Sequence, residues 1–310
     1  MTNRPLVSVV IPCYQAEKYV RETIESVAAQ TYNRLEVFAV DDGSSDKTLS
    51  VLNDYPRLVK VLHHPGSINR GVSLSRKLGI DHAGGKYTAF LDADDYFEPD
   101  KIEKQVICLE ANPNAVLCHT AINIIGEQLN AGDLKWFNFK DEIYEYDPKI
   151  EPHYLKANWI CNSSVMIKTE IMRKIPFVGN QLFQFEDWLS WSLAAEYGSF
   201  IFLPSVTTNY RSHPQSSTSQ IYKNKLKLHY SHVEFYLCLA NLSKSVETKL
   251  KCMTYLLEKV EDAYCEYRYK NPFNSENEVR REFREMLASS VCEKKVRLPE
   301  LISRAFSLLK

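Results

Sequence analysis

Short, mostly apolar runs alternate with amphipathic segments along the first part of the chain. Residues 7–11, 35–40 and 87–91 form such runs, rich in β-branched and aromatic side chains, which is typical of buried strands. Residues 71–83, before the third run, have the pattern of a helix. Strands that alternate with helices predict an α/β fold with a mostly parallel central sheet. Ligands bind such sheets at the carboxyl ends of the strands, so the residues that follow each run are candidates for a binding site.

The last part of the chain has a helical pattern. From residue 221 to 269, apolar residues recur at the spacing of a helical stripe. An Asn-Pro pair at 271–272 interrupts this pattern before another helical segment at 276–291. We therefore predict two domains, an α/β domain over residues 1–220 and a helical C-terminal extension over residues 221–310.

Three carboxylates close the third apolar run. Asp92, Asp94 and Asp95 fall within four positions just beyond it. Carboxylates this close repel one another, and each raises the pKa of the others unless a cation or hydrogen-bond donors compensate the charge. Their hard oxygen atoms suit Mg²⁺ or Mn²⁺ that carries a phosphate-bearing ligand. The alternative is a polar turn that caps the following helix.

The first two runs also end in residues with candidate chemistry. Pro12-Cys13-Tyr14 follows the first run, without the Gly-x-Gly-x-x-Gly turn that holds the pyrophosphate in dinucleotide-binding proteins. Asp41 and Asp42 follow the second run. Carboxylates at that position are well placed to accept hydrogen bonds from a nucleobase or from ribose hydroxyls.

Two further motifs lie between these strand ends. Gly43-Ser44-Ser45-Asp46 is expected to form a turn in which one of the serines caps a helix that begins at Asp46. Arg76 and Lys77 belong to the predicted helix 71–83 and precede the acidic cluster, so they are candidates to meet the same ligand. The alternative for each cation is a solvated helix face.

Taken together, these motifs resemble the family 2 glycosyltransferases, inverting enzymes with the GT-A fold. The resemblance covers residues 5 to about 215 in the expected order. It implies a Rossmann-like α/β domain that binds a nucleotide-sugar donor with a divalent metal ion, Mn²⁺ or Mg²⁺. Lys77 and Cys13 depart from the residues common in the family, which leaves the donor preference open. The matching blocks are Val9–Tyr14, Asp41–Asp46, Asn69–Arg76, Phe90–Asp95 and Glu186-Asp187.

The resemblance also implies roles for individual residues. Asp42, with Asp41 as the adjacent alternative, is expected to accept a hydrogen bond from the base of the donor. The candidate metal ligands are Asp94, Asp95 and His213. The full set of donor-binding candidates is Pro12, Tyr14, Glu17, Asp41, Asp42, Asn69, Arg76, Asp92 and Ala93.

His213 lies in a segment with loop character. Two short strands are expected at 199–203 and 206–210, and His213 follows them. Related enzymes often carry a His here that reaches the metal ion or the diphosphate, although a lone loop His is commonly just exposed. The serine-rich stretch 216–219 has the composition of a mobile loop, and we expect it to order over the donor as a lid.

The family places its general base at the acid that corresponds to Asp187, and Glu186 is the next candidate. An inverting transfer needs one base to take the proton of the acceptor hydroxyl while its oxygen attacks the anomeric carbon. Asp187 begins a predicted helix at 188–197, so the alternative is a pair of acids that favours a helix N-terminus.

Three tryptophans are candidates for the acceptor side of the site. Aromatic faces commonly stack on sugar rings, and Trp136, Trp159 and Trp188 lie in the later part of the predicted catalytic domain. The alternative is that these side chains belong to the ordinary core.

Composition is consistent with a water-soluble enzyme. Of the 310 residues, 45% are hydrophobic and 25% are charged, so the chain can bury a substantial core. No apolar stretch approaches the roughly 18 to 20 residues that span a bilayer, and we expect no signal peptide. The eight cysteines include no Cys-x-x-Cys pair, so we expect reduced thiols rather than a zinc site. These features predict a cytoplasmic protein, with the inner face of the membrane as an alternative location, and no nucleic-acid partner.

Charge is unevenly distributed along the chain. Residues 221–310 carry 17 Lys and Arg against 12 Asp and Glu, a net charge of +5, which leaves −6 for residues 1–220 given the total of −1. The ending, residues 294–310, is basic and amphipathic. Its simpler interpretation is a helix packed on the catalytic domain or on a partner in a homo-oligomer. The alternative is contact with anionic lipid near a lipid-linked acceptor.

We therefore predict a glycosyltransferase of polysaccharide biosynthesis that moves a sugar, most simply from a UDP-sugar, to a hydroxyl of a glycan or a lipid-linked glycan. The alternative from another class is a non-catalytic nucleotide-sugar-binding or scaffolding protein of the same fold. A phosphatase with an Asp-x-Asp nucleophile is disfavoured, because Tyr96 stands where that motif has Thr or Val. A phospho-receiver module is disfavoured because its acidic pair would follow the first strand.

Overall fold

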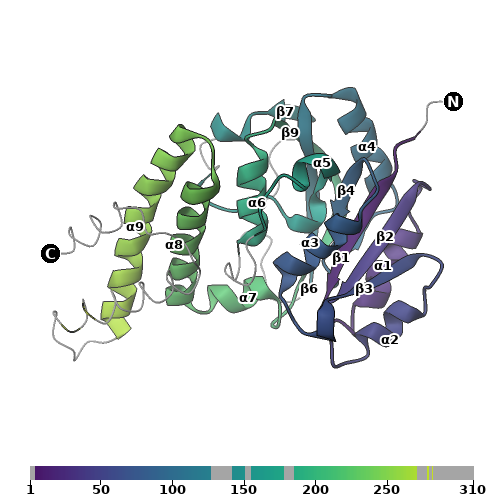
Figure 1. Ribbon diagram of the computed structural model, residues 1–310, viewed down its shortest axis with the longest axis horizontal. Coiled ribbons are helices and arrows are strands. Elements are labelled where there is room, and N and C mark those ends of the chain that lie inside the picture. Colours follow the sequence, from purple (N-terminus) through teal and green to yellow (C-terminus); the bar gives the residue numbers. More distant parts are fainter. Residues whose placement is uncertain are drawn as a thin grey trace. The chain divides into compact units, whose positions relative to one another are not determined.

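The computed structural model describes residues 4–126, 142–150, 155–177 and 185–270, with residues 278 and 281 (Figure 1). The strands are β1 Val7–Cys13, β2 Leu35–Asp41, β3 Val59–His63, β4 Tyr87–Phe90, β5 Tyr96–Phe97, β6 Ala115–Gly126, β7 Tyr144–Tyr146, β8 Met166–Lys168 and β9 Ser199–Ser212. The α-helices are α1 Val20–Ala28, α2 Thr48–Asn53, α3 Val72–His82, α4 Lys101–Ala111, α5 Thr169–Met172, α6 Glu186–Ala194, α7 Ser217–Tyr222, α8 Lys225–Leu242 and α9 Val246–Lys270. Short 3₁₀ turns are η1 Pro65–Ser67, η3 Pro148–Ile150 and η4 Asn162–Ser164.

The chain divides into two compact units. The first consists of residues 1–180 and 190–214, and the second of residues 181–189 and 215–310. This division differs from the predicted boundary at residue 220 in two respects: α7 belongs to the second unit, and so does the start of α6.

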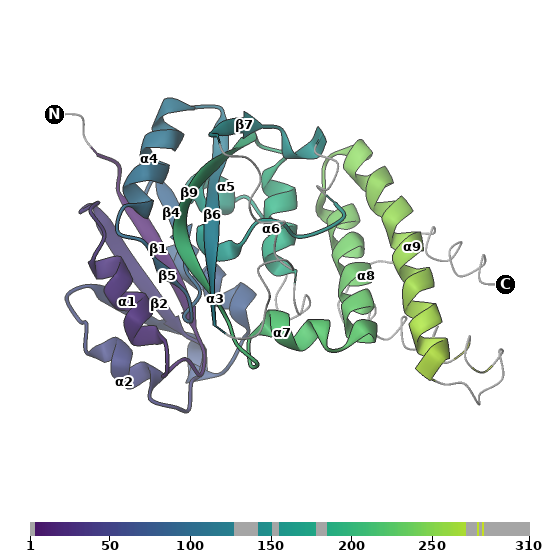
Figure 2. The same ribbon diagram turned by 180° about the vertical axis from the view of Figure 1, so that it is seen from behind.

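The first unit is built on one mixed sheet with the strand order β3-β2-β1-β4-β8-β6-β9-β5, and β7 pairs with β9. Strands β1 to β4 are mutually parallel, whereas β8 runs antiparallel to both β4 and β6. The prediction of a mostly parallel sheet therefore holds for the first four strands, and the later part of the sheet is mixed. Figure 2 shows the long strands β6 and β9, which pair in parallel, lying side by side.

Strand β9 replaces the two short strands that the sequence suggested. Leu203 pairs with Thr120 and Val206 pairs with Ala121, so two residues of β9 are left over between adjacent partners. One of them is Pro204, which has no N–H to donate to a strand ladder. The strand therefore continues through a bulge at this point, where the sequence predicted a break between two short strands.

Helices cover both faces of the parallel strands. Alternate side chains of β1 face opposite ways, and Val7, Val9 and Ile11 share one core cluster with residues of α1, α2 and α4. Helix α3 packs on the other face, where Gly79 lies against Val10. A Cβ atom at Gly79 would come within 2.4 Å of the Val10 side chain, so the close approach of α3 to β1 requires glycine.

The second unit contains α7, α8 and α9, and α8 packs against α9. The helical pattern predicted over residues 221–269 is thus present as two helices, which separate at Ser243–Ser245. The serine-rich stretch 216–219 is not a loop: Ser216 caps α7 by accepting a hydrogen bond from the N–H of Ser219 at 3.3 Å. The predicted lid is corrected to a capped helix for this reason.

Several predictions for the C-terminal part fall outside the described residues. Most of the segment 276–291 and all of the segment 294–310 lie there, so packing, oligomer and membrane contacts of the tail stay predictions, as does the cytoplasmic location. Across the described ranges, no helix combines the length and the apolar character needed to cross a membrane.

Lys101 generates a prediction about stability. Its side chain, in α4, is fully buried, donates to Oε1 of Gln105 at 2.6 Å and lies 4.1 Å from the ring centre of Phe97. Burial lowers the pKa of Lys101 to about 7. The unfolded chain keeps a value of about 10.4, so it binds more protons than the folded chain between pH 7 and 10, and stability rises with pH in that window.

We expect Lys101→Met to remove this pH dependence. Between pH 7 and 9 the free energy of unfolding of the wild type should gain about 2 kcal/mol more than that of the variant. Urea denaturation of both proteins at the two pH values measures the difference. An equal response of the two proteins to pH would contradict a buried, neutralised Lys101.

Candidate active site

The acidic turn after β4 brings together side chains from distant parts of the first unit. Oδ1 of Asp92 accepts hydrogen bonds from Nη2 of Arg76 at 2.8 Å and from Nδ2 of Asn162 at 2.9 Å. Arg76 is buried, with 6% of its surface exposed. The structure thus joins two of the predicted donor-binding residues in one ion pair, with Asn162 as a partner that the sequence did not indicate.

Asp95 points into the protein. It is 1% exposed, and its two oxygens accept from the hydroxyl of Ser163 at 2.6 Å and from the backbone N–H of Arg211 at 2.8 Å. Burial and the charges of Asp94 and Asp92 raise the pKa of Asp95, and the two donors oppose that rise. Since both oxygens already have protein partners, Asp95 is better explained as an anchor of the turn than as a metal ligand.

Asp94 is the carboxylate of this turn that combines exposure with a potential metal ligand beside it. Its side chain is 30% exposed, and Oδ2 lies 3.0 Å from Nε2 of His213. Nδ1 of His213 is buried without a hydrogen-bond partner among the described residues. Two predicted metal ligands, 119 residues apart in the sequence, therefore meet in the structure.

A carboxylate beside an imidazole fits part of a divalent cation site. Nowhere in the described ranges do three His, Cys, Asp or Glu side chains gather as a complete metal cage. Mg²⁺ bound with nucleotides does not need one, since it typically takes one or two carboxylates and completes its coordination with water and substrate phosphates. Asp94 and His213 have the chemistry for such a site.

The carboxylate of Asp42 holds the start of α3. Its two oxygens accept from the backbone N–H groups of Arg70 at 2.6 Å and Gly71 at 2.8 Å, and its side chain is buried. Gly71 has φ of +86°, a conformation that favours glycine, and directly precedes α3. Asn69 contributes as well, because its Oδ1 accepts from the same Gly71 N–H at 3.1 Å.

Two histidines that sequence analysis missed lie beside this acidic pair. Nδ1 of His63 is 3.6 Å from Oδ2 of Asp41, and Nε2 of His64 is 3.6 Å from Oδ1 of Asp42. His64 also lies within 3.0 Å of the hydroxyl of Ser75. The feature that could have revealed His63 is the parallel register of β2 and β3, in which Asp41 lies opposite His63.

Gln15 fastens the end of β1 to the turn that follows β2. Its side chain donates to Ser45 Oγ at 2.9 Å and accepts from the N–H of Asp46 at 3.1 Å, and its own N–H donates to Ser44 Oγ at 3.2 Å. Gln15 has φ of +51°, an uncommon conformation for a residue with a side chain, so these contacts hold the backbone in a strained region. Sequence analysis did not indicate this role.

The same contacts correct the predicted serine cap. Helix α2 begins at Thr48, its N-cap residue is Lys47, and no side chain caps it; Oδ1 of Asp46 accepts from the N–H of Thr48 at 3.0 Å. Both serines bond to Gln15 instead. Glu17, a predicted donor-binding residue, supports this turn by accepting from the N–H of Lys47 at 3.0 Å.

The other predicted donor-binding residues differ in exposure. Tyr14 is 52% exposed just beyond β1, so part of its ring is available to a planar ligand. Pro12 is buried within β1. Ala93 is also buried, and its carbonyl accepts from the hydroxyl of Thr23 at 2.9 Å.

Glu186 and Asp187 lie in the first turn of α6, in the second unit. Both are partly exposed, and Oδ1 of Asp187 accepts from the N–H of Trp188 at 2.6 Å. This is the contact expected of an acid at a helix start, and it does not exclude a chemical role.

The tryptophan candidates are packing residues where the structure describes them. Trp188 is 2% exposed and stacks on Phe235, with ring centres 3.8 Å apart. Trp159 is 5% exposed and contacts Tyr146. Neither ring has a face for a sugar, so the alternative of ordinary core explains them better. Trp136 lies outside the described residues.

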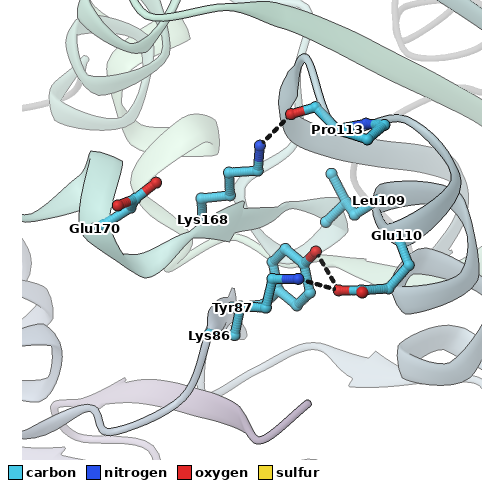
Figure 3. A pocket seen from close by; sticks show the side chains of 7 residues that line it. All are labelled: Lys86, Tyr87, Leu109, Glu110, Pro113, Lys168 and Glu170. Atoms are coloured by element: carbon cyan, nitrogen blue, oxygen red, sulfur yellow. Dashed lines mark hydrogen bonds and ion pairs between the residues drawn. The ribbon is translucent and has the colours of Figure 1, made fainter. Parts of the chain in front are cut away.

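A pocket of about 460 Å³ lies at the other end of β4 (Figure 3). Three of its charged side chains have protein partners: Glu110 accepts from Lys86 and from Tyr87, each at 2.6 Å, and Lys168 donates to the carbonyl of Pro113 at 2.6 Å. The pocket is thus at the amino end of the strand, away from Asp92. We do not assign the donor to it.

The chain is similar to known glycosyltransferases. The family model described as "Glycosyl transferase family 2" matches residues 8–169. A Haemophilus influenzae protein described as an uncharacterized glycosyltransferase is 32% identical over 237 residues, which cover 73% of this chain and 71% of that protein.

Solved structures resemble the fold at lower identity. S. aureus TarS residues 1–349, in complex with UDP-GlcNAc, has a TM-score of 0.60 at 17% identity, with 93% of this chain and 88% of that chain covered. The mannosyltransferase PcManGT of Pyrobaculum calidifontis, in complex with GDP-Man and Mn²⁺, has a TM-score of 0.58 at 16% identity and covers 99% and 86%. The GT-A fold with a C-terminal helical region is therefore confirmed.

The contacts of Asp42 generate a prediction about the turn before α3. Asp42→Asn replaces one accepting oxygen by an NH₂ group that faces a backbone donor, so we expect the free energy of unfolding to fall by about 1–3 kcal/mol. Urea denaturation measures it. Asp81→Asn is the control, because Asp81 forms an exposed pair with Lys77 and should change stability by less than about 0.5 kcal/mol. Equal stability of the two variants would show that Asp42 does not anchor this turn.

Proposed function

The protein belongs to glycosyl transferase family 2, and from this premise we propose that it transfers a sugar from a nucleotide-sugar donor to an acceptor hydroxyl with inversion, assisted by a divalent metal ion. Membership of a glycosyltransferase family sets aside the alternative of a non-catalytic binding protein. The proposal depends on one observation above all. Within the crowded acidic turn, Asp94 is partly exposed and lies 3.0 Å from His213.

The residues around the strand ends would bind the donor. Asp94 and His213 would hold the metal ion against the diphosphate of the donor. A divalent cation there supplies positive charge that stabilises the nucleoside diphosphate as it leaves. Arg76, fixed by Asp92, adds a second positive charge near the same turn. This arrangement favours departure of an anion without proton transfer to it.

The nucleobase would bind between Tyr14 and the acidic pair. The exposed ring of Tyr14 offers a stacking face, and Asp41 or Asp42 offers carboxylate oxygens to an imide N–H. Asp42 also fixes the backbone before α3, because it accepts from the N–H groups of Arg70 and Gly71.

On the acceptor side, we assign the general base to Asp187. Its carboxylate takes the proton of the acceptor hydroxyl as that oxygen forms the bond to the anomeric carbon and the bond to the diphosphate breaks. Inversion follows from this single displacement, and no covalent intermediate forms on the protein. Glu186 is the neighbouring alternative.

We propose a UDP-sugar as the donor and a glycan or lipid-linked glycan as the acceptor, as in polysaccharide biosynthesis. The likeness to a UDP-GlcNAc complex supports the first choice, and the likeness to a GDP-Man complex makes GDP the competing nucleotide. Thermal unfolding with Mn²⁺ and UDP, GDP, dTDP or CDP tests the choice, because a ligand that binds the folded state raises its apparent stability. A larger shift with GDP than with UDP would overturn it.

The metal assignment leads to a prediction for Asp94. Asp94→Ala should abolish Mn²⁺-dependent binding of UDP and sugar transfer, yet leave thermal unfolding in metal-free buffer almost unchanged, because Asp94 is partly exposed. Isothermal titration with UDP, with and without Mn²⁺, measures the first effect. Wild-type turnover by this variant would show that the metal site lies elsewhere.

The base assignment leads to a prediction for Asp187. Asp187→Asn keeps the shape of the side chain and its contact with the Trp188 N–H but removes its basicity, so transfer should fall by about 10²- to 10⁴-fold. The affinity for UDP should stay near the wild-type value. Initial rates with a true acceptor test the variant, and Glu186→Gln serves as the matched comparison. Near-wild-type rates for Asp187→Asn with low rates for Glu186→Gln would move the base to Glu186.

A further inference from the structure

Arg211 contacts the backbone of Asp94, the residue that we propose as metal ligand, and the side chain of its neighbour Asp95. Its Nε donates to the backbone carbonyl of Asp94 at 2.8 Å, and its own N–H donates to the carboxylate of Asp95 at 2.8 Å. Arg211 stands two positions before His213, which meets the Asp94 carboxylate at 3.0 Å. The end of β9 therefore contacts the acidic turn through its backbone and through two side chains.

The guanidinium of Arg211 is itself held in place. It forms an ion pair with Glu22 of α1, and its carbon lies 4.9 Å from the ring centre of Tyr19 and 5.8 Å from that of Tyr96. The Arg211 side chain is 19% exposed, so these contacts fix most of it. Tyr19 also lies against His213, with ring centres 5.2 Å apart.

This geometry joins three elements at one residue. Helix α1 supplies Glu22, the residue before it supplies the Tyr19 ring, the turn supplies the Asp94 carbonyl, and β9 supplies Arg211. A guanidinium has donors in a rigid planar fork, so one side chain can hold a carbonyl and a carboxylate at a fixed angle, which a lysine ammonium on its flexible stem does not do.

We propose that Arg211 is a positioning residue for the metal site: it fixes the Asp94 peptide so that the Asp94 carboxylate and the imidazole of His213 face the same cation. Arg211 does not itself touch the metal ion or the donor. The inference rests on the proposed function, because it presupposes that Asp94 binds the cation. Partners that orient a metal ligand commonly contribute 10- to 100-fold to metal affinity.

Binding of Mn²⁺ to the full-length protein, followed by the electron paramagnetic resonance signal of free Mn²⁺ with and without UDP, tests this inference. Arg211→Met should weaken Mn²⁺ binding by about 10- to 100-fold. Glu22→Gln should weaken it less and in the same direction, because it loosens the guanidinium without removing it. Arg21→Met is the matched control: Arg21 is also on α1, pairs with Asp54 at 2.6 Å, and should leave Mn²⁺ binding unchanged.

Two further measurements separate positioning from a merely structural role. Sugar transfer by Arg211→Met should recover toward the wild-type kcat as Mn²⁺ is raised, whereas Asp94→Ala should stay inactive at every Mn²⁺ concentration. Arg211→Lys should restore only part of the affinity. Full restoration by lysine would mean that charge alone acts, and it would overturn the role of the hydrogen bond to the Asp94 carbonyl.

The outcomes distinguish this inference from the proposed function. If Asp94→Ala binds Mn²⁺ like the wild type, the proposed metal site is wrong. If Asp94→Ala loses Mn²⁺ and Arg211→Met keeps wild-type affinity, the metal site stands and the positioning role of Arg211 falls. Should Arg211→Met fail to fold, wild-type Mn²⁺ affinity in Glu22→Gln would overturn the inference in its place.

Discussion

Mutual repulsion among Asp92, Asp94 and Asp95 is the constraint around which the first unit is organised. Each carboxylate meets a different partner: Arg76 at Asp92, Ser163 at Asp95 and His213 at Asp94. These partners come from α3, from η4 and from the end of β9, so the turn depends on the whole sheet being formed. Compensation is also unequal, because Asp92 and Asp95 each accept from two donors, whereas Asp94 meets His213 and retains capacity for a cation.

The parts of the fold that sequence analysis predicted are those with local signals. Strands β1, β2 and β4 and helix α3 follow from apolar runs and helical spacing, and the acidic residues appear where these strands end. The pairing of Arg76 with the acidic turn was also within reach, because both ends of that contact lie in one helix–strand unit.

The remainder could not be predicted because its causes are not local. Asp95 and Ser163 are 68 residues apart, and Arg211 and Asp94 are 117 apart, so no spacing rule connects them. Sequence analysis proposed Trp159 and Trp188 as sugar-binding aromatics, but both are buried. Their burial could not be predicted, because exposure depends on how the whole chain packs. The prediction that a serine caps the helix after β2 is wrong for a related reason. Gln15 forms hydrogen bonds with the hydroxyls of Ser44 and Ser45, and the sequence near residues 44–46 does not indicate this partner.

These observations bear on how the site forms during folding. The parallel strands that carry Asp42 and Asp92 need crossover connections, and β9 pairs with β6 across most of its length. Contacts of such high sequence separation form late, because the loop entropy has to be offset before they stabilise anything. Until β9 is in place, the acidic turn lacks Arg211 and His213, and its carboxylates are compensated only in part. We therefore expect the metal site to be the last feature of the first unit to form, so that an intact metal site indicates a complete sheet.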